Sequence, residues 1–219
     1  MINHLSTRIA QTFIEGPIGK IEAIYSKPEQ NKNNHVAIIC HPHPLHQGTM
    51  DNKVVTTLAK TFDKLGMATI RFNFRGVGAS EGKYDSAIGE CDDLYAVYTW
   101  AKENLGQKFV LAGFSFGSYI CCRTAEKISP EALVTVAPAV IKQDYAMYPN
   151  YKCPWWLIQG DDDEITPAED VYKWAKTHHM QPSIIKIAGA SHFFHGKLGE
   201  LENKLTEAIK DSSIINPLD

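Results

Sequence analysis

The stretch that decides the fold is Lys108–Arg123, which reads KFVLAGFSFGSYICCR. A short apolar run ends in the pentapeptide Gly-Phe-Ser-Phe-Gly, and helical apolar spacing begins directly after it. This order predicts a buried strand, a tight turn and a helix. A serine on such a turn adopts a strained backbone conformation, so its neighbours must be nearly free of side chain, and Gly113 and Gly117 meet that requirement. Ser115 is therefore a candidate nucleophile, although a glycine-rich turn can also contain a serine by chance.

The composition is that of an ordinary globular chain. Its 219 residues are 44% hydrophobic and 21% charged, which is enough for one sizeable core. No linker divides the chain, so we expect a single domain over residues 1–219. The net charge of −3 gives no electrostatic reason to expect nucleic acid or an anionic membrane as a partner, which leaves a small-molecule substrate.

The chain carries no segment typical of export or membrane insertion. Residues 1–11 lack an apolar core, and no uncharged apolar run reaches about 18 residues. The five cysteines, which include the adjacent Cys121 and Cys122, form no C-x-x-C pair. They are typical of small buried side chains rather than of a disulfide framework or a zinc site. We therefore expect a cytoplasmic protein.

Strand-like and helix-like segments alternate along most of the chain. A hairpin is predicted around residues 16–19, and apolar runs predict strands at residues 35–40, 67–72, 109–112, 132–137, 155–159 and 183–188. One-sided apolar spacing predicts helices at residues 52–65, 86–105, 168–177 and 197–210. Parallel strands need crossover connections, so this alternation predicts an α/β fold with a mostly parallel sheet, an N-terminal antiparallel hairpin and helices on both faces.

Sites in such sheets lie beyond the carboxyl ends of the strands. A nucleophilic serine there needs a histidine base and an acid that orients the histidine. The predicted strand at 155–159 leads into the acidic run 161–164, and the strand at 183–188 leads to His192. The order serine, acid, histidine along the chain is that of α/β-hydrolases.

Over about residues 10 to 210 the chain resembles small bacterial α/β-hydrolases, in particular dienelactone-hydrolase-like and esterase-like members. The superfamily segment G-x-x-D-x-x-(V/T)-P matches residues 160–167, and G-x-x-H matches residues 189–192. The resemblance implies Asp163 as the acid and His192 as the base. It leaves Asp161 and Asp162 on a solvated loop face, and His195 at the start of the last helix as a surface or capping residue.

Residues 73–80 resemble the superfamily segment D-x-R-G-x-G-x-S, with Asn73 in place of the usual aspartate. That departure concerns the bracing of a loop rather than catalysis. A dinucleotide-binding loop is the rival interpretation, because glycines follow a strand. However, Gly82 follows Gly76-x-Gly78 one residue too late for G-x-G-x-x-G, and Glu81 would repel a phosphate. We therefore expect no cofactor.

The loop at residues 41–48 follows the first core strand, where the superfamily places a backbone N–H of the oxyanion hole. The Phe116 N–H is one expected donor, and the position that matches the second is the His43 N–H. Pro44 has no N–H to donate, and Leu45 is the alternative.

The same loop contains His41, His43 and His46, which also suggests a metal site. A binuclear site with the pattern H-x-H-x-D-H would need an aspartate where Leu45 stands. We therefore expect no metal and assign these histidines to the floor and rim of the pocket.

Together these residues predict a serine hydrolase that cleaves small carboxylic esters or thioesters through an acyl-enzyme. The connection at 138–153 is too short for a full lid. Tyr145, Tyr148, Trp155 and the two phenylalanines beside Ser115 suggest an apolar or aromatic pocket, although aromatic residues at such positions are more often part of the core. A peptidase or acyltransferase would use the same triad, whereas a non-catalytic binding protein commonly lacks one member. Serine at position 115 argues against a dehalogenase or epoxide hydrolase, which would carry aspartate there. The sequence does not reveal the oligomeric state.

Overall fold

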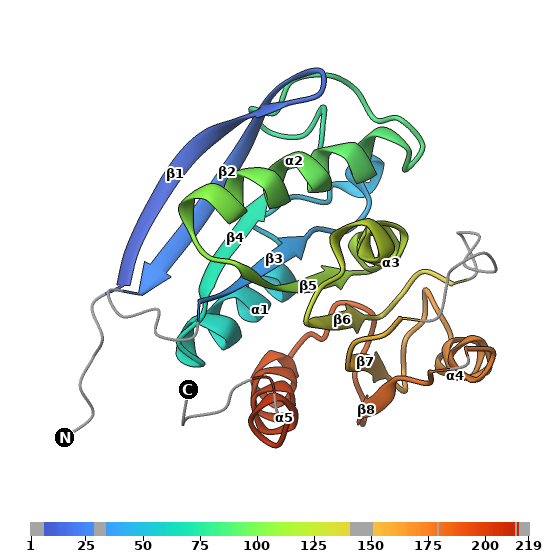
Figure 1. Cartoon of the computed structure of the whole chain (residues 1–219). Helices are drawn as coiled ribbons and strands as arrows, with labels where there is room; N and C mark the ends of the chain where they lie inside the picture. The colour runs from blue at the N-terminus through green and yellow to red at the C-terminus, as the bar shows by residue number, and fades with distance from the viewer. Residues whose placement is uncertain (1–6, 29–33, 141–150, 179, 213, 215–219) are drawn as a thin grey trace.

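A computed structural model describes residues 7–28, 34–140, 151–178, 180–212 and 214. The described strands form one eight-stranded sheet in the order β1-β2-β4-β3-β5-β6-β7-β8 (Figure 1). Their bounds are β1 (Thr7–Gly16), β2 (Gly19–Pro28), β3 (His35–Cys40), β4 (Ala68–Phe72), β5 (Lys108–Phe114), β6 (Ala132–Val136), β7 (Trp155–Gly160) and β8 (Ser183–Ile187). β2 is antiparallel to both β1 and β4, and all other neighbours are parallel.

Helices cover both faces of the sheet (Figure 1). They are α1 (Lys53–Lys64), α2 (Gly89–Asn104), α3 (Phe116–Ile128), α4 (Ala168–Lys176) and α5 (Leu198–Lys210), with a 3-10 turn at Pro44–His46. α2, α3 and α4 contribute to one apolar cluster, and α1 and α5 contribute to another. The α/β-hydrolase architecture with an N-terminal hairpin is thereby confirmed.

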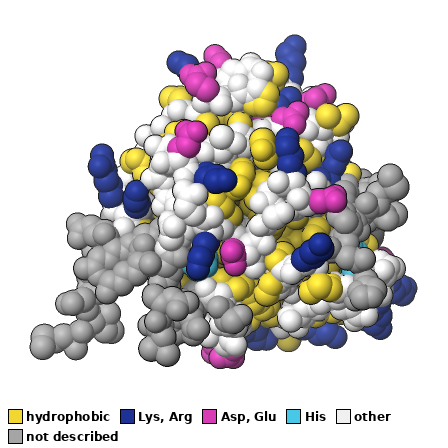
Figure 2. Space-filling model, viewed as in Figure 1, with side chains coloured by type: hydrophobic (Ala, Val, Ile, Leu, Met, Phe, Trp, Pro, Cys, Tyr) yellow, Lys and Arg dark blue, Asp and Glu magenta, His cyan; other side chains and the backbone are white. Residues whose placement is uncertain are grey.

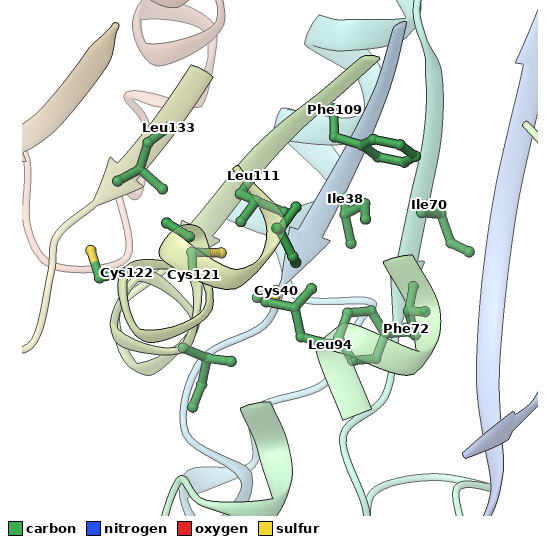
Figure 3. Packing of buried hydrophobic residues seen from close by; sticks show 14 of the residues in the cluster. Ile38, Cys40, Ile70, Phe72, Leu94, Phe109, Leu111, Cys121, Cys122 and Leu133 are labelled. Atoms are coloured by element: carbon green, nitrogen blue, oxygen red, sulfur yellow. The ribbon is translucent and has the colours of Figure 1, made fainter. Parts of the chain in front are cut away.

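The position of β3 in the sheet explains why its sequence is apolar without interruption. Ile38 and Cys40 belong to the cluster beneath α2 and α3, whereas Ile39 belongs to the cluster beneath α1 and α5. A strand buried on both faces has no polar side to alternate with its apolar one. In Figure 3, Cys40 and Cys121 lie in the first of these layers, and all five cysteines of the chain are free thiols.

α2 begins later than the apolar pattern predicts. Ser86 and Ala87 have φ values of 52° and 68°, so the chain makes a left-handed turn before the helix. Ile88, which the pattern assigns to the buried face, is exposed. A Cβ on Gly89 would lie 1.7 Å from a guanidinium nitrogen of Arg75, so the helix starts where the chain has no side chain to clash with this arginine.

The connection between β6 and β7 is only partly described. Tyr145 and Tyr148, which we expected near the pocket, lie outside the described residues. Of the two positions that the sequence allows for Trp155, pocket or core, the structure shows the core: Trp155 is buried against Trp174 and His178, and its indole N–H donates to the Thr135 hydroxyl at 2.9 Å.

The surface carries charges of both signs. Figure 2 shows lysine and arginine side chains interspersed with acidic ones on the face in view. Among the described residues, the longest helices are too short or too polar to cross a lipid bilayer.

Candidate active site

The site is organised around the turn between β5 and α3. Ser115 lies there with φ 53° and ψ −114°, a backbone conformation that side-chain-bearing residues rarely adopt. A Cβ on Gly113 would lie 2.3 Å from the backbone of Gly117, and one on Gly117 would lie 2.2 Å from the Cys40 carbonyl oxygen. Both glycines are therefore required by close backbone contacts, as the sequence predicts.

A buried serine that the sequence analysis missed holds this turn against the sheet. The Ser118 Oγ lies 2.7 Å from the Gly113 carbonyl oxygen, to which it donates, and it accepts the Val136 N–H at 3.1 Å. The Ser115 N–H in turn donates to the Val136 carbonyl oxygen at 2.8 Å. The turn is thus fixed to the end of β6 from two sides.

His192 connects Ser115 to Asp163. Its Nε2 lies 3.1 Å from the Ser115 Oγ, and its Nδ1 lies 2.8 Å from the Asp163 Oδ2. All three side chains are buried. If Nδ1 donates to the carboxylate, Nε2 is left as the acceptor for the serine proton, which is the arrangement that a general base requires.

Asp163 is held by donors from its own loop and strand. Its Oδ1 accepts the N–H groups of Ile165 and Thr166 at 2.9 and 2.7 Å, and its Oδ2 accepts the Gln159 side-chain N–H at 3.0 Å. Burial alone would raise the pKa of Asp163, but the hydrogen bond and charge of His192 and the two backbone donors outweigh it and lower that pKa below its ordinary value. The carboxylate is therefore charged at neutral pH.

Three further polar residues position the acid and base loops. Gln159 is fully buried at the end of β7, where a polar residue in an apolar strand was a signal that the sequence analysis did not use. The Glu164 carboxylate accepts the His192 N–H at 3.1 Å. Asp161 is exposed as expected, yet it also accepts the Gly189 N–H at 2.6 Å and so ties the two loops together.

Of the two expected roles of His195, surface residue or helix cap, the structure supports the surface position. Its side chain is exposed, and it lies before the helix, because the N-cap position of α5 is Lys197. The intervening Gly196 has φ 70°, which turns the chain before the helix begins.

The two expected oxyanion donors lie on different elements beside the serine. Phe116 is the first residue of α3, so its N–H belongs to the group that has no partner within the helix. His43 precedes the 3-10 turn, and both residues line the same cleft as Ser115. The Leu45 N–H donates to the His43 Nδ1 at 3.2 Å, which disfavours Leu45 as the alternative donor.

His41 anchors the loop that carries His43. It is fully buried, its Nδ1 lies 2.6 Å from the Pro42 carbonyl oxygen, and its Nε2 accepts the Phe74 N–H at 3.0 Å. Burial lowers the pKa of His41 to about 4 and outweighs the hydrogen bond to the Pro42 carbonyl, which raises it, while the nearby His43 lowers it further. Both ring nitrogens are engaged within the protein, and the described part of the chain holds no group of three His, Cys, Asp or Glu side chains placed for a metal ion.

The loop after β4 is braced by buried polar groups. Arg75 forms an ion pair with Asp93, with its Nη2 2.7 Å from Oδ1 and both its Nε and its backbone N–H 3.0 Å from Oδ2. The Asn73 side chain accepts the Met50 N–H at 2.8 Å and donates to the Glu22 carboxylate at 2.7 Å. An aspartate at position 73 would face Glu22 with a second negative charge, which explains the departure from the superfamily pattern.

A cleft of about 470 Å³ opens over Ser115 and His192. Its lining residues are Pro42, His43, His46, Gln47, Asn52, Ser115, Phe116, Ala139, Ile165, His192 and Phe193. None of these described residues is acidic. The cleft therefore suits a neutral or anionic substrate group better than a cationic one.

Comparison with known proteins identifies the relatives of this chain. The family model described as serine aminopeptidase, S33, matches residues 34–152. A Rickettsia prowazekii protein is 35% identical over 209 residues, which cover 90% of this chain and 87% of the relative. An α/β serine hydrolase without a lid from Xanthomonas campestris is 37% identical, with a TM-score of 0.87 over 93% of this chain and 94% of the other. An α/β serine hydrolase homologue from Coxiella burnetii is 44% identical, with a TM-score of 0.88 over 91% and 97%.

Proposed function

Because this chain belongs to the family of α/β serine hydrolases, we propose that it cleaves small carboxylic esters or thioesters through an acyl-enzyme, with Ser115 as the nucleophile. The observation that carries the proposal is the continuous hydrogen-bonded chain from the Ser115 Oγ through His192 to Asp163. This chain of contacts opens into the cleft rather than into the core.

The reaction follows from this geometry in two halves. The Ser115 Oγ attacks the substrate carbonyl carbon while His192 Nε2 takes the serine proton, and His192 then returns that proton to the leaving alcohol or thiol. Asp163 holds the histidine in the required tautomer and stabilises the imidazolium. A water molecule, deprotonated by His192, then attacks the acyl carbon, and His192 returns this proton to the Ser115 Oγ as the ester bond to the serine breaks and the acid leaves.

The negative charge that develops on the carbonyl oxygen needs donors in place before the reaction. The N–H of Phe116, at the start of α3, is one donor in this proposal, and the N–H of His43 is the second. Each such donor contributes roughly 3 to 4 kcal/mol to transition-state stabilisation. Both residues line the same cleft as Ser115, which supports this assignment.

The lining of the cleft favours an ester over an aminopeptidase substrate. An aminopeptidase must recognise a free α-ammonium group, for which a carboxylate is the natural partner. The described lining residues of the cleft include none, and the aromatic ring of Phe193 and the side chains of Ile165 and Ala139 offer apolar contacts instead. The related lidless hydrolase from Xanthomonas campestris is also consistent with an open site for small substrates.

The first test is covalent labelling of the nucleophile. Intact mass is measured after incubation with a fluorophosphonate for the wild type, Ser115→Ala, His192→Ala and the control Ser191→Ala. We expect one adduct on the wild type and on the control, and none on the other two variants. An adduct that persists on Ser115→Ala, or no adduct on folded wild type, would reject Ser115 as the nucleophile.

A second test separates the substrate classes. Hydrolysis of p-nitrophenyl acyl esters, acyl thioesters and aminoacyl p-nitroanilides is compared for the same preparation. We expect turnover of the esters or thioesters and little of the anilides. Faster turnover of the anilides would favour the peptidase, and acyl transfer to added alcohol in preference to water would favour an acyltransferase.

A further inference from the structure

β1 forms one edge of the sheet, and no other described element lies beyond it (Figure 1). The strand is ten residues long and pairs with β2 in one unbroken register. Natural edge strands are commonly protected by lysine, proline, bulges or short length. β1 has no lysine, proline or bulge, and its charged residues Arg8 and Glu15 stand near its two ends, whereas β8 at the opposite edge is five residues long and carries Lys186.

The direction of the β2 backbone fixes which β1 groups face outward. The Glu22 N–H donates to the Ser80 hydroxyl at 2.9 Å, and the Glu22 carbonyl accepts the Asn73 N–H at 2.9 Å. Lys20 likewise directs its N–H and carbonyl to Glu81. Both residues of β2 therefore turn their backbone groups away from β1.

Directly opposite residues of an antiparallel pair either both face each other or both face away. Phe13 lies opposite Glu22, so its backbone N–H and carbonyl point to the open edge. Alternation along the strand gives the same direction to Gln11 and Ile9. The outer edge therefore offers a regular row of backbone donors and acceptors.

The same residues carry exposed apolar side chains. Ile9 is 70% exposed and Phe13 is 49% exposed, and both lie on one face of the strand because they are separated by an even number of positions. They are placed symmetrically about Gln11, which is two positions from each. The pattern is thus complementary to itself when the strand is reversed.

We propose that a second copy of this chain docks on this edge, with β1 pairing antiparallel to β1 about a two-fold axis at Gln11. This register places Ile9 of each copy opposite Phe13 of the other, and it matches outward-facing backbone groups with outward-facing ones. Arg8 and Glu15 lie near opposite ends of the strand and on its opposite faces, so the antiparallel arrangement brings one charge of each sign to each end of the interface without a directly opposed pair.

Other registers of the β1–β1 pair match the two strands less favourably. A shift by one residue would pair outward-facing with inward-facing residues and would put the apolar side chains on opposite faces. A shift by two residues would set Ile9 against Glu15 and Phe13 against Gln11. Only the register centred on Gln11 pairs both exposed apolar side chains with each other.

The mass of the full chain in solution tests the interface. Light scattering across a dilution series is expected to give twice the chain mass of 24.4 kDa at high concentration and a decrease towards that mass on dilution. Phe13→Lys is expected to be monomeric where the wild type is dimeric. Ile18→Lys in the hairpin turn and Ile184→Lys on β8 change comparably exposed apolar residues and are expected to leave the dimer intact. A monomeric wild type, or a dimer lost in Ile184→Lys but not in Phe13→Lys, would overturn the proposal.

Cysteine crosslinking tests the register itself. In this arrangement the two Gln11 Cα atoms form a directly opposed pair about 5.5 Å apart, which a disulfide can span. Gln11→Cys is therefore expected to give a covalent dimer on mild oxidation. Thr12→Cys would lie diagonal to its copy, roughly 7 to 8 Å away, and is expected not to crosslink above the background of the wild type. Crosslinking of Thr12→Cys in place of Gln11→Cys would reject the register, and ester hydrolysis should be unchanged in every variant because β1 lies outside the cleft.

Discussion

Two buried carboxylates, Asp163 and Asp93, show how the partner of a charge decides its use. Both accept several hydrogen bonds and both are shielded from water. Asp163 faces His192, whose proton can move, whereas Asp93 faces Arg75, whose charge is permanent. The first carboxylate is therefore suited to orient a base, and the second holds the loop at residues 73–82 in place.

The largest effect is expected on kcat when Asp163 is replaced, with the stability of the fold nearly unchanged. Asp163→Asn retains an acceptor for the Ile165 and Thr166 N–H groups but presents an N–H to His192, so it favours the wrong tautomer. We expect kcat to fall by about 10⁴-fold with a small change in the free energy of unfolding. Steady-state hydrolysis and urea denaturation measure the two quantities. The neighbouring Asp162→Asn should change neither, and wild-type activity in Asp163→Asn would remove this carboxylate from the mechanism.

The converse experiment removes the structural carboxylate. Asp93→Asn removes the hydrogen-bonded counter-charge of the buried Arg75 guanidinium and leaves only the less direct charges of Asp85 and Glu90, and we expect a loss of about 3 to 5 kcal/mol in the free energy of unfolding. The folded fraction should keep most of its kcat. The control is Asp85→Asn, because Asp85 is exposed and lies 3.7 Å from Arg75, so its loss should cost less than about 1 kcal/mol. Equal effects of the two substitutions in urea denaturation would contradict the assigned role of Asp93.

A smaller effect should come from His41, whose buried ring contacts the Pro42 carbonyl oxygen and the Phe74 N–H rather than a carboxylate. Its folded pKa of about 4 lies below the ordinary 6.5, so the unfolded chain binds more protons between these values and stability falls as the pH falls through this window. By pH 5 this group should reduce the free energy of unfolding by about 2 kcal/mol relative to pH 7. His41→Gln lacks the titrating group, and its loss between pH 7 and 5 should be smaller by that amount. A wild type and variant with parallel pH dependence would show that His41 is not neutral in the folded state.

The smallest effect concerns the residue that departs from the superfamily pattern. Asn73→Asp should place two carboxylates together at the partly buried Glu22 and reduce the free energy of unfolding by about 1 kcal/mol. Adding Glu22→Gln in the same chain should recover most of that loss, because the amide can donate where Asn73 did. A double-mutant cycle in urea measures the coupling, and strictly additive effects would mean that Asn73 and Glu22 act independently.

The fold and the proposed triad could be predicted because their signals are local. Ser115, Asp163 and His192 each lie just after a recognisable strand, and the strand order of a parallel sheet brings such positions together. The supporting contacts could not be predicted in the same way. Ser118 contacts Val136 at a separation of 18 positions, and Asn73 contacts Glu22 at a separation of 51. The sequence adjacent to Ser118 or Asn73 does not indicate which distant residue each one contacts.

Two misplaced features have physical reasons of the same kind. The start of α2 depends on the room that Gly89 leaves for Arg75, which is a contact with another loop. Trp155 was suggested for the pocket, with the core as the alternative, because it is aromatic and follows the connection from β6. Its position in the first half of β7 places it at the opposite end of the strand from Asp163, where it joins the core.

The narrow gap between Gly117 and Cys40 determines how closely the start of α3 packs against the end of β3. A single added Cβ would meet the Cys40 carbonyl oxygen at 2.2 Å and the His41 carbonyl oxygen at 2.7 Å, so a hydrogen atom is the largest group that fits. Through this gap the start of α3 is seated directly on the chain segment that leads to His43. The absence of a Cβ at Gly117 therefore sets the spacing between the N–H groups of Phe116 and His43, which are 73 positions apart in sequence. With alanine at position 117, every atom of the proposed reaction would still be present, but these two N–H groups would be held at the wrong separation.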